Sequence, residues 1–141
     1  KIVPIKLAKE KNAKDYKLSK LNELGYGKLY LFFLYKIYEF YLEKLKIPKD
    51  KIRFRELGEE ERAFYNKAHF DVELYIESLG GFKEVAGLHY RSDYDLSRHQ
   101  QHSKERLEVL WNNKKILPHV IELSFGVDRN IFAFLDIFFK Q

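Results

Sequence analysis

The segment from residue 70 to residue 90 carries the pattern that most restricts the fold. Apolar residues at every second position from Phe70 to Ile76 alternate with Asp71, Glu73 and Tyr75, which is typical of a strand with one buried face. Turn residues follow at 78–81, and an apolar stretch returns over residues 82–90. This order of strand, turn and strand predicts a β-hairpin.

Other patterns predict the elements around this hairpin. Apolar residues at helical spacing over 29–45 predict one strong helix, which ends before Pro48. We expect its aromatic side chains to pack against the sheet rather than to stack on bases, because apolar residues cover more than one face. The remaining expected elements are a helix over 59–69, a short helix or turn from Asp95, strands over 106–111 and 117–125, and a helix over 127–139. Together these elements predict an α+β fold, with an antiparallel sheet and helices on one side.

Length and composition indicate a soluble protein of one domain. A chain of 141 residues with 45% hydrophobic and 33% charged residues can bury a modest core. Within the domain 1–141, residues 1–50 are expected to form a lysine-rich connector and the aromatic helix, and residues 51–141 to form the sheet. The longest apolar run, residues 29–35, is far shorter than the ~20 residues of a membrane span. We therefore expect a cytoplasmic protein without membrane contact.

Charge and cysteine content exclude some kinds of site. The net charge of +5 permits a polyanionic partner, but a lysine-rich surface of this kind is also common without one. The chain contains no cysteine, which excludes disulfides and thiolate metal sites. His99 and His102 lie three residues apart without an evident third ligand, so no metal site is predicted.

The segment from Val120 to Arg129 carries the strongest chemical signal. Glu122 and Ser124 are two residues apart on an expected strand and therefore point to the same face. Gly126 and Arg129 follow where this strand turns into a helix. A carboxylate can take an ammonium group and an arginine fork can take phosphate oxygens, so the layout can hold a small zwitterion beside a phosphate.

Two blocks of sequence resemble a known family. The segment 120–129 is similar to motif 3 of the class II aminoacyl-tRNA synthetases. Residues 81–99, GFKEVAGLHYRSDYDLSRH, resemble the archaeal and eukaryotic glycyl-tRNA synthetases, as do residues 53–57 and 61–73. The resemblance covers about residues 45–141 in family order, and it implies the later half of a class II synthetase catalytic domain.

The resemblance implies a reaction and a set of site residues. The reaction is the ATP-dependent ligation of glycine to tRNA(Gly) through glycyl-adenylate, with Mg²⁺ accompanying ATP and a homodimer as the full-length enzyme. The implied ATP-binding residues are Glu84, Val85 and Arg129, the last of which is also the implied catalytic residue, and the implied glycine-binding residues are Glu122, Leu123 and Ser124. Leu123 stands where the family usually has proline, which leaves the acid and the hydroxyl in place.

The family's motifs 1 and 2 lie upstream of the resembling region and have no counterpart before Arg53. This chain alone is therefore expected to be inactive as a glycine–tRNA ligase. The alternative is a non-catalytic nucleic-acid-binding or polymerase-accessory protein on a synthetase-like fold. The presence of Glu84, Glu122, Ser124 and Arg129 argues against this alternative, because a protein that only binds has no reason to keep all four.

Several charged residues also have a plain structural explanation. By strand periodicity alone, Glu84 would be a solvent-facing acid. Arg129 could instead pair with Asp128 or Asp136 at the start of its helix. The triplet His89-Tyr90-Arg91 stands where relatives usually have Ala-Asp-Arg, so Arg91 is first a candidate for a structural ion pair. The roles of Asp93, His99 and His102 stay open.

Overall fold

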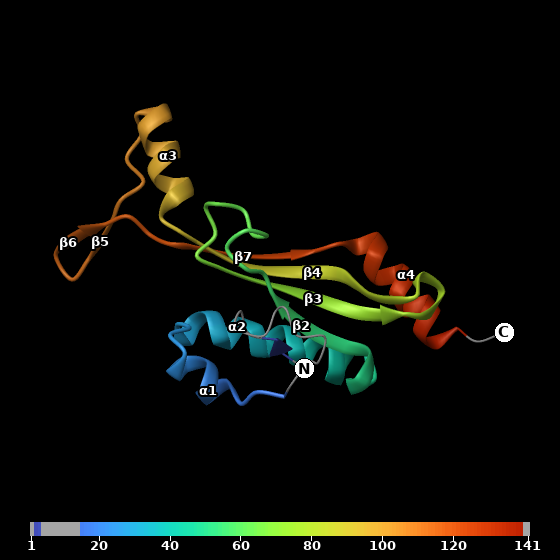
Figure 1. Cartoon of the computed structure of the whole chain (residues 1–141). Helices are drawn as coiled ribbons and strands as arrows, with labels where there is room; N and C mark the ends of the chain where they lie inside the picture. Colours follow the sequence, from blue (N-terminus) through green and yellow to red (C-terminus); the bar gives the residue numbers. More distant parts are fainter. Residues whose placement is uncertain (1, 4–14, 140–141) are drawn as a thin grey trace.

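A computed structural model describes residues 2–3 and 15–139 of the chain. The helical elements are α1 (Leu18–Glu23), α2 (Lys28–Glu39), the π-helix η2 (Phe40–Lys44), the 3-10 turns η3 (Lys49–Lys51) and η4 (Glu77–Leu79), α3 (Tyr94–Ser103) and α4 (Val127–Phe138). The strands are β1 (Ile2–Val3), β2 (Ile52–Glu56), β3 (Ala68–Ile76), β4 (Gly81–Ser92), β5 (Val109–Trp111), β6 (Lys114–Ile116) and β7 (Val120–Phe125). Figure 1 shows α1 and α2 along one side of the sheet, and α3 with the β5–β6 hairpin projecting from one end.

The expected hairpin forms the centre of the sheet. Strands β3 and β4 pair antiparallel around a turn in which Gly80 adopts a left-handed conformation, with φ of 66°. The sheet order is β1-β2-β3-β4-β7, and only β1 is parallel to its neighbour. The α+β fold, with an antiparallel sheet and helices, is therefore confirmed at the level of architecture.

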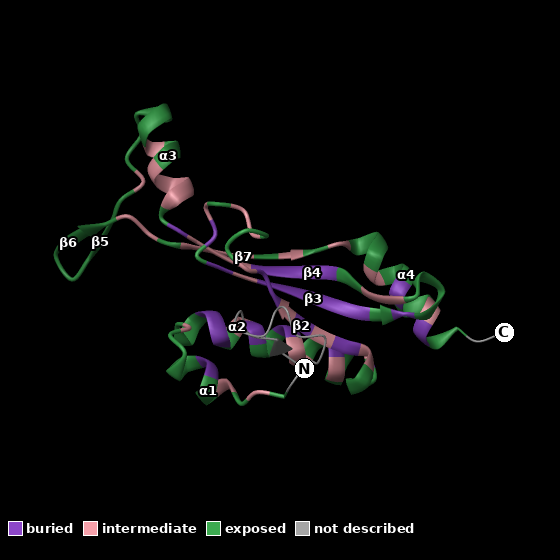
Figure 2. Cartoon of the chain, in the orientation of Figure 1, coloured by how far each residue is buried: buried purple, intermediate pink, exposed green. Residues whose placement is uncertain are grey.

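Helix α2 and its continuation η2 cover the apolar face of this sheet. Tyr30, Leu34 and Ile37 on α2 and Tyr41 on η2 are buried, together with alternate residues of β3. Figure 2 shows that buried residues concentrate along β3, β4 and the side of α2 that faces them. This confirms that the aromatic stretch over 29–45 packs against the sheet. Only its last turn departs from the expected α-helix, because Leu45 N–H bonds the carbonyl of Phe40, five residues back.

Two expected elements are corrected. Residues 59–67 form turns rather than a helix, because side chains there bind the local backbone. Glu61 accepts the N–H of Gly58, and Arg62 donates to the carbonyl of Lys67. The strand expected over 106–111 is shorter, β5, and it pairs with β6 in a separate two-stranded sheet instead of joining the main one.

The N-terminal connector is only partly described. The single short helix expected within residues 1–28 is α1, whose Leu21 is fully buried. The rest of the expected connector, residues 4–14, lies outside the described residues. None of the helices in the described ranges is long and apolar enough to cross a membrane.

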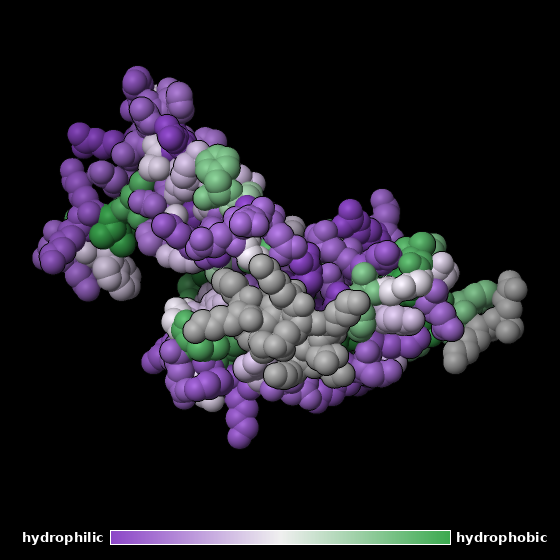
Figure 3. Space-filling model, in the orientation of Figure 1, coloured by the Kyte–Doolittle hydropathy of each residue, from purple (hydrophilic) through white to green (hydrophobic). Residues whose placement is uncertain are grey.

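Helix α4 forms where expected. Its run of apolar residues from Ile131 to Phe139 predicts burial along most of its length behind the sheet, and this prediction is wrong. Only Ala133 and Ile137 are buried, whereas Ile131, Phe132, Phe134, Leu135 and Phe138 are 41–55% exposed. In Figure 3 hydrophobic atoms gather at the end of the molecule where α4 lies. A helix lying on a single layer buries only one stripe, and no second layer covers α4 within the described part of the chain.

This narrow contact predicts unequal costs for two substitutions on one helix. Ile137→Ala should lower the free energy of unfolding by about 2–5 kcal/mol, because it leaves a cavity against the sheet. Leu135→Ala, at a side chain 54% exposed, is the matched control and should cost less than about 1 kcal/mol. Urea denaturation of both variants measures the difference. Equal costs would contradict the one-stripe packing of α4.

Candidate functional site

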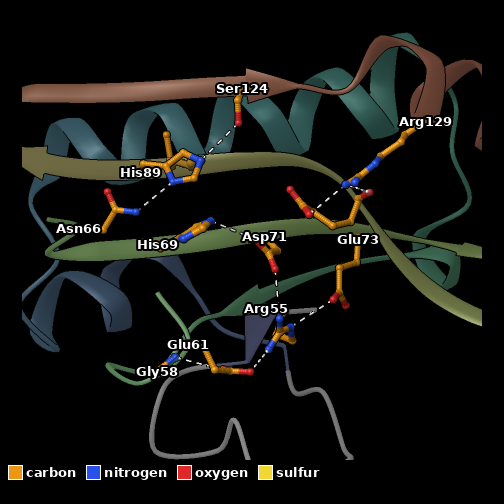
Figure 4. A network of polar contacts seen from close by, with 12 residues as sticks. Arg55, Gly58, Glu61, Asn66, His69, Asp71, Glu73, His89, Ser124 and Arg129 are labelled. Atoms are coloured by element: carbon orange, nitrogen blue, oxygen red, sulfur yellow. Dashed lines mark hydrogen bonds and ion pairs between the residues drawn. The ribbon is translucent and has the colours of Figure 1, made fainter. Parts of the chain in front are cut away.

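The sheet face opposite α2 is polar, and the strand register assembles it in rows. One row aligns Arg53, Glu73 and Glu84; the next aligns Arg55, Asp71, Gly87 and Ser124; the third aligns His69, His89 and Glu122. Figure 4 shows Ser124, His89, His69, Asp71 and Arg55 crossing this face from strand to strand. Three of the residues implied to bind ATP or glycine therefore share one face.

Arginines neutralise the buried acids of this face. The residues Asp71 and Glu73 are each 6% exposed. Arg55 contacts both at 3.2 Å and also Glu61 at 2.9 Å, while Arg53 binds Glu73 from the neighbouring position on β2. The hydrogen bonds to Arg55 and to the Gly58 N–H lower the pKa of Glu61. Buried carboxylates need such partners, so these ion pairs form a rigid polar floor under the site.

Position 85 carries a β-bulge that decides where Glu84 points. Val72 pairs with Ala86, but the next residue, Glu73, pairs with Glu84, so Val85 is an extra residue on β4. Strict alternation from Ala86 would place Glu84 on the apolar face. The bulge moves Glu84 to the polar face and leaves Val85 buried.

The turn between β7 and α4 is fastened to this bulge. The carbonyl of Val85 accepts the Gly126 N–H at 3.0 Å and the Asn130 Nδ2 at 2.8 Å. Asn130 Oδ1 in turn accepts the Tyr41 hydroxyl at 2.6 Å. Asn130 therefore joins β4, α4 and η2. Sequence reasoning missed this residue, and its only signal was a polar residue directly before an apolar run.

This fastening brings Arg129 to Glu84. Arg129 Nη1 lies 3.0 Å from Glu84 Oε2, and Figure 4 shows its side chain reaching back from α4 toward β4. Arg129 thus pairs with Glu84 rather than with Asp128 or Asp136, and Asp136 instead accepts the N–H groups of η4. The two side chains are 63% and 48% exposed. Such an exposed pair is worth little in stability, so a ligand can open it at low cost.

Glu122 is held by an arginine from the neighbouring strand. Arg91 binds Oε2 of Glu122 and also binds Asp95, with Nη2 at 2.9 Å from Oδ1. These hydrogen bonds, the Asp95 one first, raise the pKa of Arg91. The expected structural ion pair of Arg91 is confirmed. Within the described residues Oε1 of Glu122 makes no hydrogen bond or ion pair, which leaves this oxygen for a ligand.

Ser124 and Leu123 point to opposite faces of β7. Ser124 shares the polar face with Gly87, whereas Leu123 pairs with Leu88 on the apolar face. The Ser124 hydroxyl lies 3.3 Å from His89 Nε2, and His89 Nδ1 lies 3.3 Å from the Asn66 amide nitrogen. Of the sequence signals, only the departure at 89–91 pointed toward His89.

Glu84, Glu122 and Ser124 lie on one face of the sheet but do not line one cavity. Glu84 and Arg129 border a cavity of about 580 Å³, together with Ile76, Lys83 and Asp128. Glu122 and Ser124 do not line this cavity. His99 and His102 lie exposed on α3, and Asp93 is exposed at its start. Across residues 2–3 and 15–139, no three acidic or histidine side chains form a metal site.

His89 gives this face a predicted pH dependence. Burial, then the nearby His69, lower the pKa of His89 from its usual 6.5; Arg91 acts in the same direction, while Glu122 and Asp71 oppose it. Below pH 6.5 the unfolded chain therefore binds a proton that the folded chain resists, and stability should fall as the pH drops from 6.5 toward the folded-state pKa.

Urea denaturation between pH 7 and pH 5 measures this loss, which should be smaller in His89→Gln, where the titrating group is gone. His102→Gln, at an exposed position, should behave as the unchanged protein does. The same pH dependence in all three proteins would contradict the role assigned to His89.

Comparison with known proteins identifies relatives of this chain. No protein-family model matches it. Over 97 residues, or 67% of the chain, it is 42% identical to a glycine–tRNA ligase of Clostridium beijerinckii, of which it covers 20%. It is 36% identical over 98 residues to the Treponema denticola enzyme, covering 67% of the chain and 21% of the relative. A Mycoplasmopsis synoviae relative of the same name is 41% identical over 102 residues, covering 71% of the chain and 22% of the relative.

The chain resembles only a part of each of these relatives. All three are bacterial, so the resemblance is not restricted to archaeal and eukaryotic proteins. The chain spans about one fifth of the length of these relatives. Identities of 36–42% over about two thirds of the chain establish common descent. The chain is therefore homologous to one segment of the glycine–tRNA ligases.

Proposed function

We propose that this chain supplies the glycine-binding and ATP-binding residues of a class II glycine–tRNA ligase. The observation that carries the proposal is the contact of Arg129 with Glu84 on the same polar sheet face as Glu122 and Ser124. Glu84, which holds the arginine for phosphate, and the acid–hydroxyl pair for an amino acid thereby lie on the neighbouring strands β4 and β7. The names of the relatives support glycine and tRNA as the substrates.

Glycine would bind through its ammonium group. Oε1 of Glu122 and the hydroxyl of Ser124 accept its hydrogens, while Arg91 holds the other oxygen of Glu122 in place. Leu123 contributes backbone only, because its side chain lies on the opposite face. Glycine has no side chain to recognise, so specificity comes from excluding larger amino acids from a small space.

ATP would bind beside Glu84 and Arg129. Arg129 leaves its exposed pair with Glu84 and meets the negative charge that grows as the glycine carboxylate attacks the α-phosphorus. Val85 acts through its backbone, because its side chain is buried. Mg²⁺ carried in with ATP would supply positive charge for the phosphates, and Glu84, the carboxylate paired with Arg129, is the side chain that would help to hold it.

The products, the oligomeric state and the location of the whole enzyme belong to the same proposal. The products would be glycyl-adenylate and pyrophosphate, and the glycyl group would then pass to tRNA(Gly) with release of AMP. The full-length ligase would act as a homodimer in the cytoplasm. Each of these properties belongs to the whole enzyme, of which this chain corresponds to about one fifth.

Two substitutions separate the proposed roles. In a glycine–tRNA ligase containing this segment, Glu122→Ala should raise the KM for glycine sharply, since the carboxylate holds the ground-state ammonium. Arg129→Ala should mainly lower kcat, by about 10²–10³-fold, since its charge is needed in the transition state. Glycine-dependent ATP–pyrophosphate exchange measures both, with Arg98→Ala on α3 as the control. Equal and small effects of Glu122→Ala and Arg129→Ala would show that neither residue has its assigned role.

The chain by itself should not catalyse this exchange at an enzymatic rate. The resemblance provides no motif 2 arginine for the α-phosphate, and stabilisation of that kind is commonly worth about 3 kcal/mol or more. The measurement is the same exchange assay on the isolated chain. A rate near that of a complete ligase would overturn the assignment of the α-phosphate contact to another segment.

A further inference from the structure

The imidazole of His89 fills the space above Gly87. The two residues are neighbours on the polar face of β4, and Gly87 has no side chain to keep the ring away. A Cβ atom built on Gly87 would lie only 2.6 Å from His89 Nε2 and 3.3 Å from the Ser124 hydroxyl. The ring therefore rests directly over the backbone of β4, in the gap that the glycine opens next to Ser124. Figure 4 shows Ser124 pointing down at this ring.

The contacts of the ring with Asn66 and Ser124 favour one position for its proton. The Asn66 amide nitrogen is a donor and lies 3.3 Å from Nδ1, so Nδ1 accepts. In the neutral ring the proton is then on Nε2, which faces the Ser124 hydroxyl at 3.3 Å. The ring of His69, with its centroid 3.9 Å from that of His89, supports the imidazole from β3.

Nε2 of His89 lies beside the Ser124 hydroxyl, where the nitrogen of the proposed amino-acid ligand would bind. In the proposed function, an amino-acid ammonium donates a hydrogen to the Ser124 hydroxyl and lies near Glu122, which pairs with His89 across the strands. The imidazole N–H already makes the Ser124 contact. A ligand nitrogen and the imidazole cannot both occupy this place.

We propose that His89 competes with the ligand in the amino-acid pocket, occupying the ammonium subsite beside Ser124 until a ligand displaces it. This inference rests on the proposed glycine site. It adds that a side chain of the protein itself competes with the ligand for part of that site. An ammonium group displaces the ring because it brings a positive charge to Glu122 and three donors, whereas the neutral imidazole brings one. Bulkier ammonium ligands must displace the ring and also find room for their side chains.

Glycine titrated into this chain and three variants tests the proposal, with chemical shifts of backbone amides as the readout. His89→Ala empties the subsite, and glycine should bind about threefold to tenfold more tightly, the worth of one hydrogen bond. His89→Leu keeps bulk above Gly87 and should show little of this gain. His102→Ala, on α3, is the control and should bind as the unchanged chain does. Glycine betaine, which has no N–H group to donate, should show no gain in any variant.

The outcomes separate this inference from the proposed function. Tighter glycine binding in His89→Ala alone supports the occupied subsite. Weaker or unchanged binding in His89→Ala, or an equal gain in His89→Leu, would overturn it while leaving the glycine site standing. Absence of glycine binding by all four proteins would overturn the proposed function together with the inference.

Discussion

The β-bulge at Val85 is the constraint on which the candidate site depends. One extra residue in β4 changes the face that every residue before it presents, because side chains alternate along a strand. Glu84 thereby joins the polar face, and the Val85 carbonyl becomes the acceptor for Gly126 and Asn130. The same bulge thus places Glu84 on the polar face and anchors the turn that carries Arg129.

The apolar face of the sheet stabilises the fold, and the polar face carries the candidate site. The apolar face buries Phe54, Phe70, Val72 and Leu88 against α2, and this burial supplies most of the driving force. The polar face is almost entirely paired internally, with arginines from β2 and β4 bound to acids on β3 and β7. Groups held in this way lose little freedom when a ligand arrives.

Helix α4 shows why an apolar pattern does not measure burial. Its sequence is apolar on nearly all sides, yet the stripe through Asn130, Ala133 and Ile137 alone faces the sheet. Contacts at its two ends fix the helix: Asn130 at the first turn and Asp136, which accepts the N–H groups of Glu77 and Ser78. Polar contacts therefore set the orientation of α4, and through it the position of Arg129.

The sequence alone determined the central hairpin, the aromatic helix over 29–45 and the closing helix, because period and turn residues are local properties. The residues of the candidate site follow from the resemblance to a family and stay a prediction. The helix predicted over 59–69 was wrong, because over 59–67 Glu61 and Arg62 bind the nearby backbone instead of extending a helix. Only the tertiary structure decided that Glu84 meets Arg129, that Arg91 holds Glu122 and that His89 lies over Gly87. These contacts join residues 2 to 45 positions apart through strand register and a bulge, which depend on pairing between strands and not on the order of residues within one.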